Sequence, residues 1–212
     1  MVRFISKNKV ILCLITCFIT FENSSGQTTF KRAGDYYALE RNEQALTSYI
    51  FTEVSEFVEG KAWVNQGELY GYIDTLGQPI TAYLYADVGG YTNGFAAVSK
   101  DTQDGYYGFI DAQGSEICPL QFTRVLPFKI GYAAVQKDTS WSLIDSTGVQ
   151  LFEAVYDYPP LVISSRFVIV SQNLKWGVID VIGNKQYDFI YDLITPDGTA
   201  YLQNKKVYLG LL

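Results

Sequence analysis

Four aspartates recur along the chain at a nearly constant spacing, and they form its only repeated polar feature. Asp74, Asp111, Asp145 and Asp180 lie 37, 34 and 35 residues apart. Repeated carboxylates suit two kinds of chemistry, the binding of Ca²⁺ and the activation of a substrate. A calcium ion needs six to eight oxygen ligands within about 2.6 Å, which carboxylates placed one per repeat do not supply. A metal or catalytic role is therefore disfavoured for these residues.

A structural role explains the same aspartates better. Each is followed by a glycine three residues later, as in Asp74-Thr75-Leu76-Gly77. Aspartate at the first position and glycine at the fourth position favour a type I turn. The aspartate side chain then accepts a hydrogen bond from the backbone N–H two residues further on. The sequence therefore predicts that these aspartates form turns.

The remaining residue types offer little catalytic chemistry. The chain has 0 histidines, which removes imidazole bases, histidine zinc ligands and Ser-His-Asp triads. Cys118 lies between Ile117 and Pro119 in an apolar segment, where a buried and unreactive thiol is expected. No glycine-rich phosphate loop is present. The sequence predicts no enzyme, no cofactor and no metal site, and an acid-pair hydrolase is the least favoured alternative.

The aspartates belong to a longer signature that must position them. It consists of an aromatic residue, a small residue, any residue, an aliphatic residue and the aspartate, with glycine three positions later. Self-similarity at a fixed period indicates a tandem array of one supersecondary unit. The residues assigned to this structural motif are Tyr70, Gly71, Ile73, Asp74, Gly77, Tyr107, Gly108, Ile110, Asp111, Gly114, Trp141, Ile144, Asp145, Gly148, Trp176, Gly177, Ile179, Asp180 and Gly183.

Two further segments repeat in register with the signature. A Gly-x-Ala-x-Val segment such as 94–98 precedes the signature, and an aromatic-x-x-Val segment lies upstream of it. Alternating segments rich in Val, Ile, Tyr and Phe, bounded by Gly, Asp, Asn and Pro, predict strands. Short connections make consecutive strands antiparallel neighbours. Each unit is therefore predicted to be a three-stranded meander. The glycine after the aromatic is expected to allow an aromatic ring to approach its backbone.

The array is predicted to extend beyond the four clear copies. Aligned without gaps on residues 107–125, residues 36–54 form a degenerate first unit that has Tyr36 at the position of Tyr107 and lacks the Gly-x-Ala-x-Val strand. Terminal repeats are commonly atypical. A short helix is the alternative, because residues 37–46 contain good helix formers.

The last residues of the chain give a second partial unit. Residues 209–212 match the aromatic-glycine strand cut off before its aspartate. The predicted organisation is a leader over 1–26 and a β-repeat domain over 27–212, with clear units over about 55–195 and a truncated unit over 196–212.

The residues from Trp176 to Asp180, the turn that follows and the preceding Gly-x-Ala-x-Val segment resemble the WG (or KWG) repeat family of bacterial tandem β repeats. The resemblance covers about residues 36–212. Tyr70 and Tyr107 depart from it by replacing tryptophan, and Ser142 departs from it by replacing glycine. The resemblance implies an all-β repeat fold used as an interaction module, with no family-wide catalytic residue.

The first 26 residues have the three-part pattern of a secretory signal peptide. A basic start is followed by an apolar run over 10–21, which is too short to be a good membrane anchor, and by small residues before Gln27. Cleavage there would leave 186 residues exported to the periplasm, the outer surface or the medium. A lipoprotein attached at Cys17 is the disfavoured alternative, because polar residues do not follow the cysteine.

The charge balance restricts the partners. Removal of three basic residues and one acidic residue with the leader would change the net charge from −6 to −8. An acidic surface repels phosphate backbones, so nucleic acid is excluded, and no stable membrane span is expected. The favoured partner is another protein of the bacterial envelope, and the alternative is a glycan stacked on exposed aromatics. Candidates for such stacking are Trp63, Trp141, Trp176, Tyr70 and Tyr107.

Two architectures fit a tandem array of such units. An open, twisted array of three-stranded antiparallel repeats of about 35 residues is favoured, with partial units at both ends. A closed, propeller-like ring is the alternative, because strands from the two ends would join into one more blade.

Overall fold

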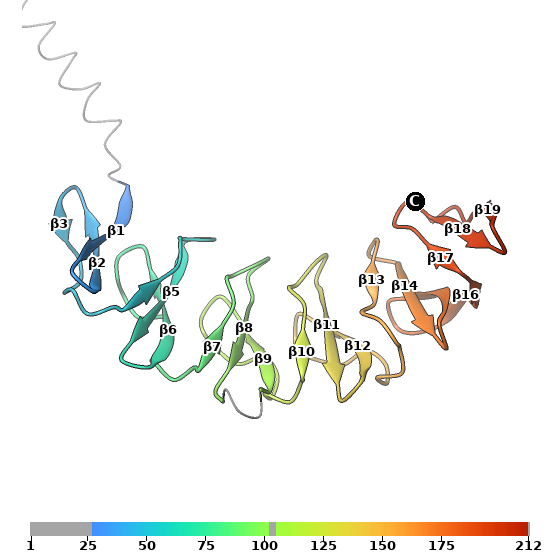
Figure 1. Cartoon of the computed structure of the whole chain (residues 1–212), viewed down its shortest axis with the longest axis horizontal. Coiled ribbons are helices and arrows are strands. Elements are labelled where there is room, and N and C mark those ends of the chain that lie inside the picture. Colours follow the sequence, from blue (N-terminus) through green and yellow to red (C-terminus); the bar gives the residue numbers. More distant parts are fainter. Residues whose placement is uncertain (1–26, 102–104, 212) are drawn as a thin grey trace, which may run out of the picture. The chain divides into compact units, whose positions relative to one another are not determined.

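The chain is built from small antiparallel sheets that follow one another in sequence order (Figure 1). The computed structural model describes residues 27–101 and 105–211, and these residues form strands and turns without a helix. Accordingly, no helix in the described part is long and apolar enough to cross a membrane. The predicted leader over residues 1–26 lies outside the described residues.

The chain divides into two compact units, one that ends at Phe51 and one that begins at Thr52. The first unit contains one sheet, with strands β1 (Thr28–Ala33), β2 (Tyr36–Arg41) and β3 (Gln44–Ala45). The second unit contains five sheets. Their strands are β4 (Glu53–Val54), β5 (Lys61–Gln66), β6 (Leu69–Asp74); β7 (Asp87–Val88), β8 (Ala96–Ser99), β9 (Tyr107–Ile110); β10 (Arg124–Val125), β11 (Tyr132–Lys137), β12 (Ser140–Asp145); β13 (Leu161–Val162), β14 (Phe167–Gln172), β15 (Lys175–Asp180), β16 (Lys185–Tyr191); and β17 (Leu193–Ile194), β18 (Thr199–Leu202), β19 (Lys205–Tyr208).

Each sheet of the second unit contains the predicted three-stranded meander. In the first of them the order is β4-β5-β6, with the aromatic-x-x-Val strand outside, the Gly-x-Ala-x-Val strand in the middle and the signature strand beside it. The long strands pair in full register, from Lys61 with Asp74 to Gln66 with Leu69. Two-residue turns close most of these hairpins, as at Gly67-Glu68, where Gly67 has a φ of 81°. Such turns match the twist of the flanking strands.

A fourth segment lies along the outer edge of the signature strand, which the sequence did not predict. In the third sheet Trp141 and Tyr156 pair across this edge, and so do Ile144 and Gln150. In the fourth sheet this segment is regular enough to form strand β16. The segment runs directly into the first strand of the next sheet. Each connection is therefore hydrogen-bonded to two successive sheets.

The first sheet differs from its prediction in two respects. Strand β1 pairs with β2 along its whole length, so the sheet does contain the strand that was predicted to be missing. Tyr37 rather than Tyr36 pairs with Phe51, as Tyr107 pairs with Phe122. The gap-free alignment was wrong by one residue because a two-residue turn at Asn42-Glu43 replaces the longer Asp-x-x-Gly turn. The alternative helix over 37–46 is also wrong.

The last sheet corrects a second prediction. The strand paired with β18 is β19, with Ala200 opposite Val207, so residues 209–211 are not the signature strand, and residue 212 lies outside the described residues. Leu209 and Leu211 are buried instead in a cluster with residues of the fourth and fifth sheets. The apolar pattern was recognised correctly, but its place in the sheet was not.

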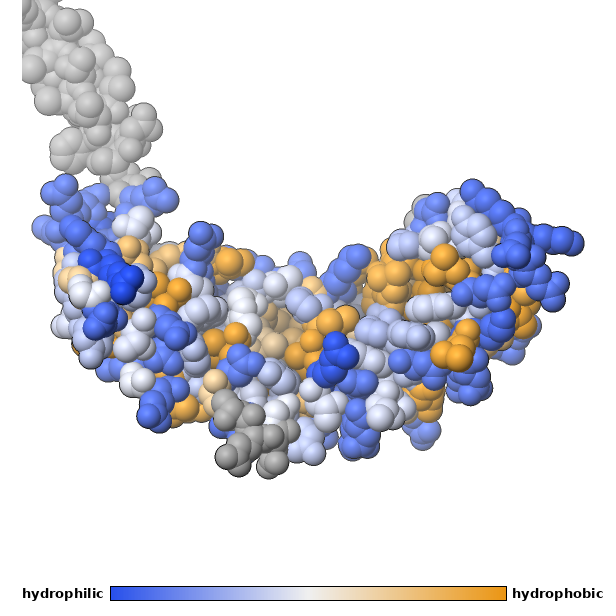
Figure 2. Space-filling view, viewed as in Figure 1, coloured by the Kyte–Doolittle hydropathy of each residue, from blue (hydrophilic) through white to orange (hydrophobic). Residues whose placement is uncertain are grey.

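The core lies between successive sheets of the second unit. The aliphatic residue of the signature is almost fully buried in every clear copy, and so is the residue before it. These alternate positions face opposite sides, so both faces of each sheet are covered. In the view of Figure 2, apolar side chains gather over β13 and β14, and hydrophilic side chains cover much of the last sheet.

Candidate functional site

Each of the four signature aspartates stabilises a turn by accepting hydrogen bonds from backbone N–H groups. In the second clear copy, Asp111 Oδ1 accepts hydrogen bonds from the N–H groups of Gln113 and Ser115, both at 2.9 Å. The Gly114 N–H donates to the Asp111 carbonyl at 3.0 Å. The bond from the residue two positions on is the one that the turn interpretation predicts. The other three aspartates accept the equivalent pairs of N–H groups, from Leu76 and Gln78, Thr147 and Val149, and Ile182 and Asn184.

In two of these turns the hydrogen bonds favour the ionised carboxylate. Burial acts to raise the pKa of Asp145, but bonds from the Thr147 hydroxyl and N–H hold that pKa below its usual value. The pKa of Asp180 is lowered in the same way, because bonds from Asn184 outweigh burial. Among the described residues, no three Cys, Asp or Glu side chains come together as potential metal ligands.

The glycines of the last three of these turns, Gly114, Gly148 and Gly183, pack on the preceding sheet. At Gly148 a Cβ atom would lie 2.0 Å from the Ile117 carbonyl oxygen, and at Gly114 it would lie 2.7 Å from the Ile80 carbonyl oxygen. Both glycines also have a positive φ of 81°. Glycine is therefore needed twice, for the turn and for the contact between sheets.

The glycine that follows the aromatic accepts a close approach from the fourth segment of its own sheet. A Cβ at Gly71 would lie 2.9 Å from the Tyr83 ring, and one at Gly177 would lie 3.0 Å from the Phe189 ring. At Gly108 the neighbour is Leu120 instead. An aromatic neighbour was expected, and the structure has one in two of these three copies. Ser142 replaces this glycine in the third copy and donates a hydrogen bond to the Phe152 carbonyl at 2.5 Å.

Each signature aromatic contacts one residue that lies in the short first strand of its sheet or, for Trp176, three residues before that strand. Where the aromatic is tyrosine, the partner is an acid: the Tyr70 hydroxyl donates to Glu53 at 2.6 Å, and the Tyr107 hydroxyl donates to Asp87 at 2.5 Å. These bonds raise the pKa of both phenols, and burial adds to the shift.

Where the aromatic is tryptophan, the partner changes. The Arg124 guanidinium lies 5.6 Å from the centre of the Trp141 ring, and the Tyr158 ring stacks on Trp176 at 5.7 Å. An indole has no hydroxyl to donate, so a cation or a second ring suits its face better than a carboxylate does. These pairs occupy one equivalent position in four successive sheets.

The aromatics suggested for glycan stacking are all engaged within the protein. Trp141 is 3% exposed. Trp63 meets Tyr70 edge to face at 5.5 Å, and Tyr158 covers Trp176. A sugar ring needs an open aromatic face, so these contacts count against stacking at these positions.

The Cys118 thiol is buried, as predicted. Burial raises its pKa, which keeps it protonated and unreactive.

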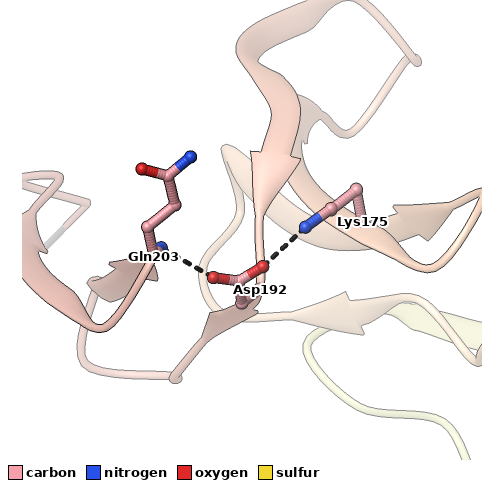
Figure 3. Close-up of polar contacts among 3 residues, drawn as sticks. All are labelled: Lys175, Asp192 and Gln203. Carbon is pink, nitrogen blue, oxygen red and sulfur yellow. Dashed lines mark hydrogen bonds and ion pairs between the residues drawn. The ribbon is translucent and has the colours of Figure 1, made fainter.

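Successive sheets are also joined by polar contacts. Asp192 accepts a bond from the Gln203 N–H at 2.8 Å and pairs with Lys175 Nζ at 2.6 Å (Figure 3). Gln203 lies in the turn of the last hairpin, and Lys175 begins β15. The bond to Lys175 holds the pKa of Asp192 below its usual value.

Clefts open between the sheets of the second unit. The largest of those described has a volume of about 420 Å³ and lies between the second and third of these sheets. Val88, Ala97 and Val125 give it an apolar floor, and Asp87 and Arg124 give it charges of opposite sign. Two other clefts, of about 110 and 100 Å³, lie between the first and second and between the third and fourth sheets. A volume of some hundreds of Å³ is typical of a ligand site.

No repeated motif of the sequence indicated this cleft. None of the structural motif residues except Tyr107 lines it. The available signal was that Gly89 and Ala97 are both small, whereas each of the two flanking copies has a larger side chain at one or both of these positions. Two small residues indicate a cleft only when the residues that lie opposite them are known.

Comparisons with solved structures give weak likenesses. Hsv2 of Kluyveromyces lactis matches at 13% identity over 74% of this chain and 62% of that chain, with a TM-score of 0.39. A eukaryotic initiation factor matches at 12% identity over 77% of this chain and 52% of that chain, with a TM-score of 0.46. The N-terminal domain of Nup159 matches at 11% identity over 82% and 61%, with a TM-score of 0.37. The chain thus spans less than two thirds of the length of each, and likenesses of this size do not bear on its function.

Comparison with protein families is more specific. No curated protein matches the sequence. The WG containing repeat family matches three tandem segments, residues 42–70, 70–101 and 107–138. The matched segments contain the Tyr70 and Tyr107 signature strands and the turns that follow them. Residues 42–138 of this chain are therefore tandem repeats of the WG containing repeat family.

Proposed function

We propose that the chain is a non-enzymatic, exported binding module whose partner is another protein of the bacterial envelope. The partner would bind over the cleft between the second and third sheets of the second unit. The cleft is the observation that carries this proposal, because it joins an apolar floor to a charged rim. Buried apolar anchors within a polar rim are typical of protein interfaces.

Other observations support the same proposal. The signature residues are used in turns and in contacts between sheets, so they are unsuited to chemistry on a substrate. The glycan alternative loses its first candidates, because Trp63, Trp141 and Trp176 contact other residues of the chain. Export remains a proposal from the leader pattern at residues 1–26.

The proposal is tested by retention of partners on the immobilised protein, expressed from its full sequence. Envelope extract and a panel of soluble polysaccharides are applied separately. We expect saturable retention of one or a few proteins that no polysaccharide displaces. Binding of polysaccharides alone would show that the glycan alternative is correct.

A matched pair of variants locates the interface. Arg124→Ala removes a charge from the cleft, whereas Arg166→Ala removes another exposed arginine, which lies over Phe167 and does not line the cleft. We expect only Arg124→Ala to weaken retention. Equal retention by both variants would place the partner elsewhere on the protein.

A further inference from the structure

The first strand and the middle strand of successive sheets carry equivalent residues at one position beside the cleft. The equivalence follows from the same backbone hydrogen bond in three sheets. In each sheet a backbone N–H group that follows the first strand donates to a carbonyl oxygen of the middle strand. The bonds run from Ser55 to Trp63 at 3.0 Å, from Gly89 to Ala97 at 2.8 Å, and from Leu126 to Ala134 at 2.9 Å. The three pairs therefore occupy one structural position in three copies of the same unit.

The first of these sheets shows what fills this position. The Trp63 indole packs edge to face against Tyr70, with ring centres 5.5 Å apart and an interplanar angle of 82°. Tyr70 is held in turn by its bond to Glu53.

The second sheet has the same hydrogen bond between an acid and the signature tyrosine, but it lacks the indole. Tyr107 is held by Asp87 as Tyr70 is held by Glu53. Ala97 stands at the position of Trp63, and Gly89 stands at the position of Ser55. The second sheet therefore has neither the indole nor the hydroxyl group here. The cleft here is about 420 Å³.

The third sheet also has alanine, Ala134, at the middle-strand position. Leu126 stands where the second sheet has Gly89, so a large side chain is present at this position in the third sheet. Of these three positions, only that of Gly89 and Ala97 has no side chain larger than a methyl group. At this position the second sheet therefore lacks the large side chain that Trp63 and Leu126 provide in the two neighbouring sheets.

We infer that this cleft receives an aromatic side chain of the partner protein, with tryptophan as the best fit. The ring would lie on Gly89 and Ala97 and meet Tyr107 edge to face, as Trp63 meets Tyr70. Val88 and Val125 would cover its other sides. A buried aromatic anchor in a fitted pocket is the residue type that dominates binding energy at protein interfaces. This inference rests on the proposed function, because it names the group by which the partner is held.

The inference is tested with N-acetyl-L-tryptophanamide as the probe and the protein expressed from its full sequence. Amide resonances are followed by NMR during titration, with N-acetyl-L-alaninamide as the control compound. We expect saturable shifts confined to residues 87–89, 97, 107 and 123–125, and none with the alanine compound. Absence of these shifts at tens of millimolar probe, or shifts spread over the whole protein, would overturn the inference.

Substitutions within the cleft supply the matched controls. Ala97→Trp places the missing indole in the cleft and should weaken probe binding at least about tenfold. Ala82→Trp makes the same change at an exposed position of the same unit and should leave binding unchanged. Gly89→Leu copies the third sheet and is the second filling variant, because a Cβ at Gly89 has its nearest neighbour at 3.6 Å. Unchanged probe binding in a folded filling variant would contradict the inference.

The same variants separate this inference from the proposed function. If the envelope partner binds wild type and Ala97→Trp equally, the binding function stands and the aromatic site is wrong. If neither protein retains a partner, the proposed function fails, whatever the probe does. Loss of the partner and of the probe together in Ala97→Trp supports both.

Discussion

At the scale of single residues, the choice between tyrosine and tryptophan in the signature depends on a partner about 17 to 20 residues away. Tyr70 and Tyr107 face acids that accept their hydroxyl groups, whereas Trp141 faces Arg124. The tyrosines that depart from the WG pattern therefore have a physical reason. A hydroxyl is retained where a carboxylate is present to receive it.

The turn aspartates should contribute to stability through their acceptor oxygen. We expect Asp111→Ala to lower the free energy of unfolding by about 1–2 kcal/mol, because two backbone N–H groups lose their partner. Asp111→Asn keeps an oxygen at that position and should cost less than half as much. Urea unfolding measures both. Equal losses in the two variants would contradict the capping role.

Acid should destabilise the protein through the same kind of residue. The pKa values of Asp145, Asp180 and Asp192 are lowered in the folded state, so these groups stabilise it above their unfolded pKa of about 3.9. That stabilisation is lost as the pH falls below about 4 towards the folded pKa values. Urea unfolding at pH 5 and pH 3 should show the decrease. Asp192→Asn should reduce the loss of unfolding free energy between pH 5 and pH 3. The same loss in this variant as in wild type would show that Asp192 does not contribute.

At the scale of elements, the segment after each signature strand joins two sheets. It pairs with the outer edge of one signature strand and then becomes the first strand of the next sheet, as from Gln150 and Tyr156 to Val162. The turn of the following sheet packs back on it through a glycine. Neighbouring sheets are therefore tied together by backbone as well as by side chains.

Gly67 and Gly148 allow the stability cost of turn strain to be distinguished from the cost of disturbing the contact between sheets. Gly67 and Gly148 both have a φ of 81°, but a Cβ would meet nothing within 4 Å at Gly67 and the Ile117 oxygen at 2.0 Å at Gly148. We expect Gly67→Ala to cost about 1–2 kcal/mol, as is usual for left-handed backbone. Gly148→Ala should cost about 1–3 kcal/mol more, because the added methyl group overpacks the contact. Thermal unfolding compares the two, and similar losses would mean that the contact yields easily.

At the scale of the whole molecule, each sheet of the second unit depends on its neighbours for a core. Ile144 belongs to the third of these sheets and is fully buried with Phe109 and Phe122, which precede that sheet in the chain. A repeat that contacts only its neighbours is stabilised largely by those interfaces. Damage to one sheet should therefore spread to the next.

Ile144→Asp should unfold more than its own repeat. A buried unpaired carboxylate is costly, and its removal from the core exposes the adjoining sheet. Hydrogen exchange should show lost protection in β8 and β9 as well as in β11 and β12. Val149→Asp is the control, because Val149 is 57% exposed and should leave exchange unchanged. Loss confined to residues 132–145 would contradict coupling between repeats.

The sequence by itself determined the period, the three recurring strands of the clear copies and their Asp-x-x-Gly turns. These depend on local chemistry: alternating side chains choose the strand, and an aspartate binds N–H groups two and four residues away. The family resemblance followed from the same local signature. Even the burial of Cys118 could be predicted from its immediate neighbours.

Only the tertiary structure decided the register of the first sheet, the place of the last strand and the position of the cleft. A two-residue turn at Asn42-Glu43 shifted the first sheet by one position, which a gap-free alignment does not detect. The cleft depends on Gly89 and Ala97 lying opposite Val125 across two sheets. Such contacts join residues that lie up to a full repeat apart in the chain. Whether a small side chain leaves a space is decided by what packs against it, so no local pattern encodes it.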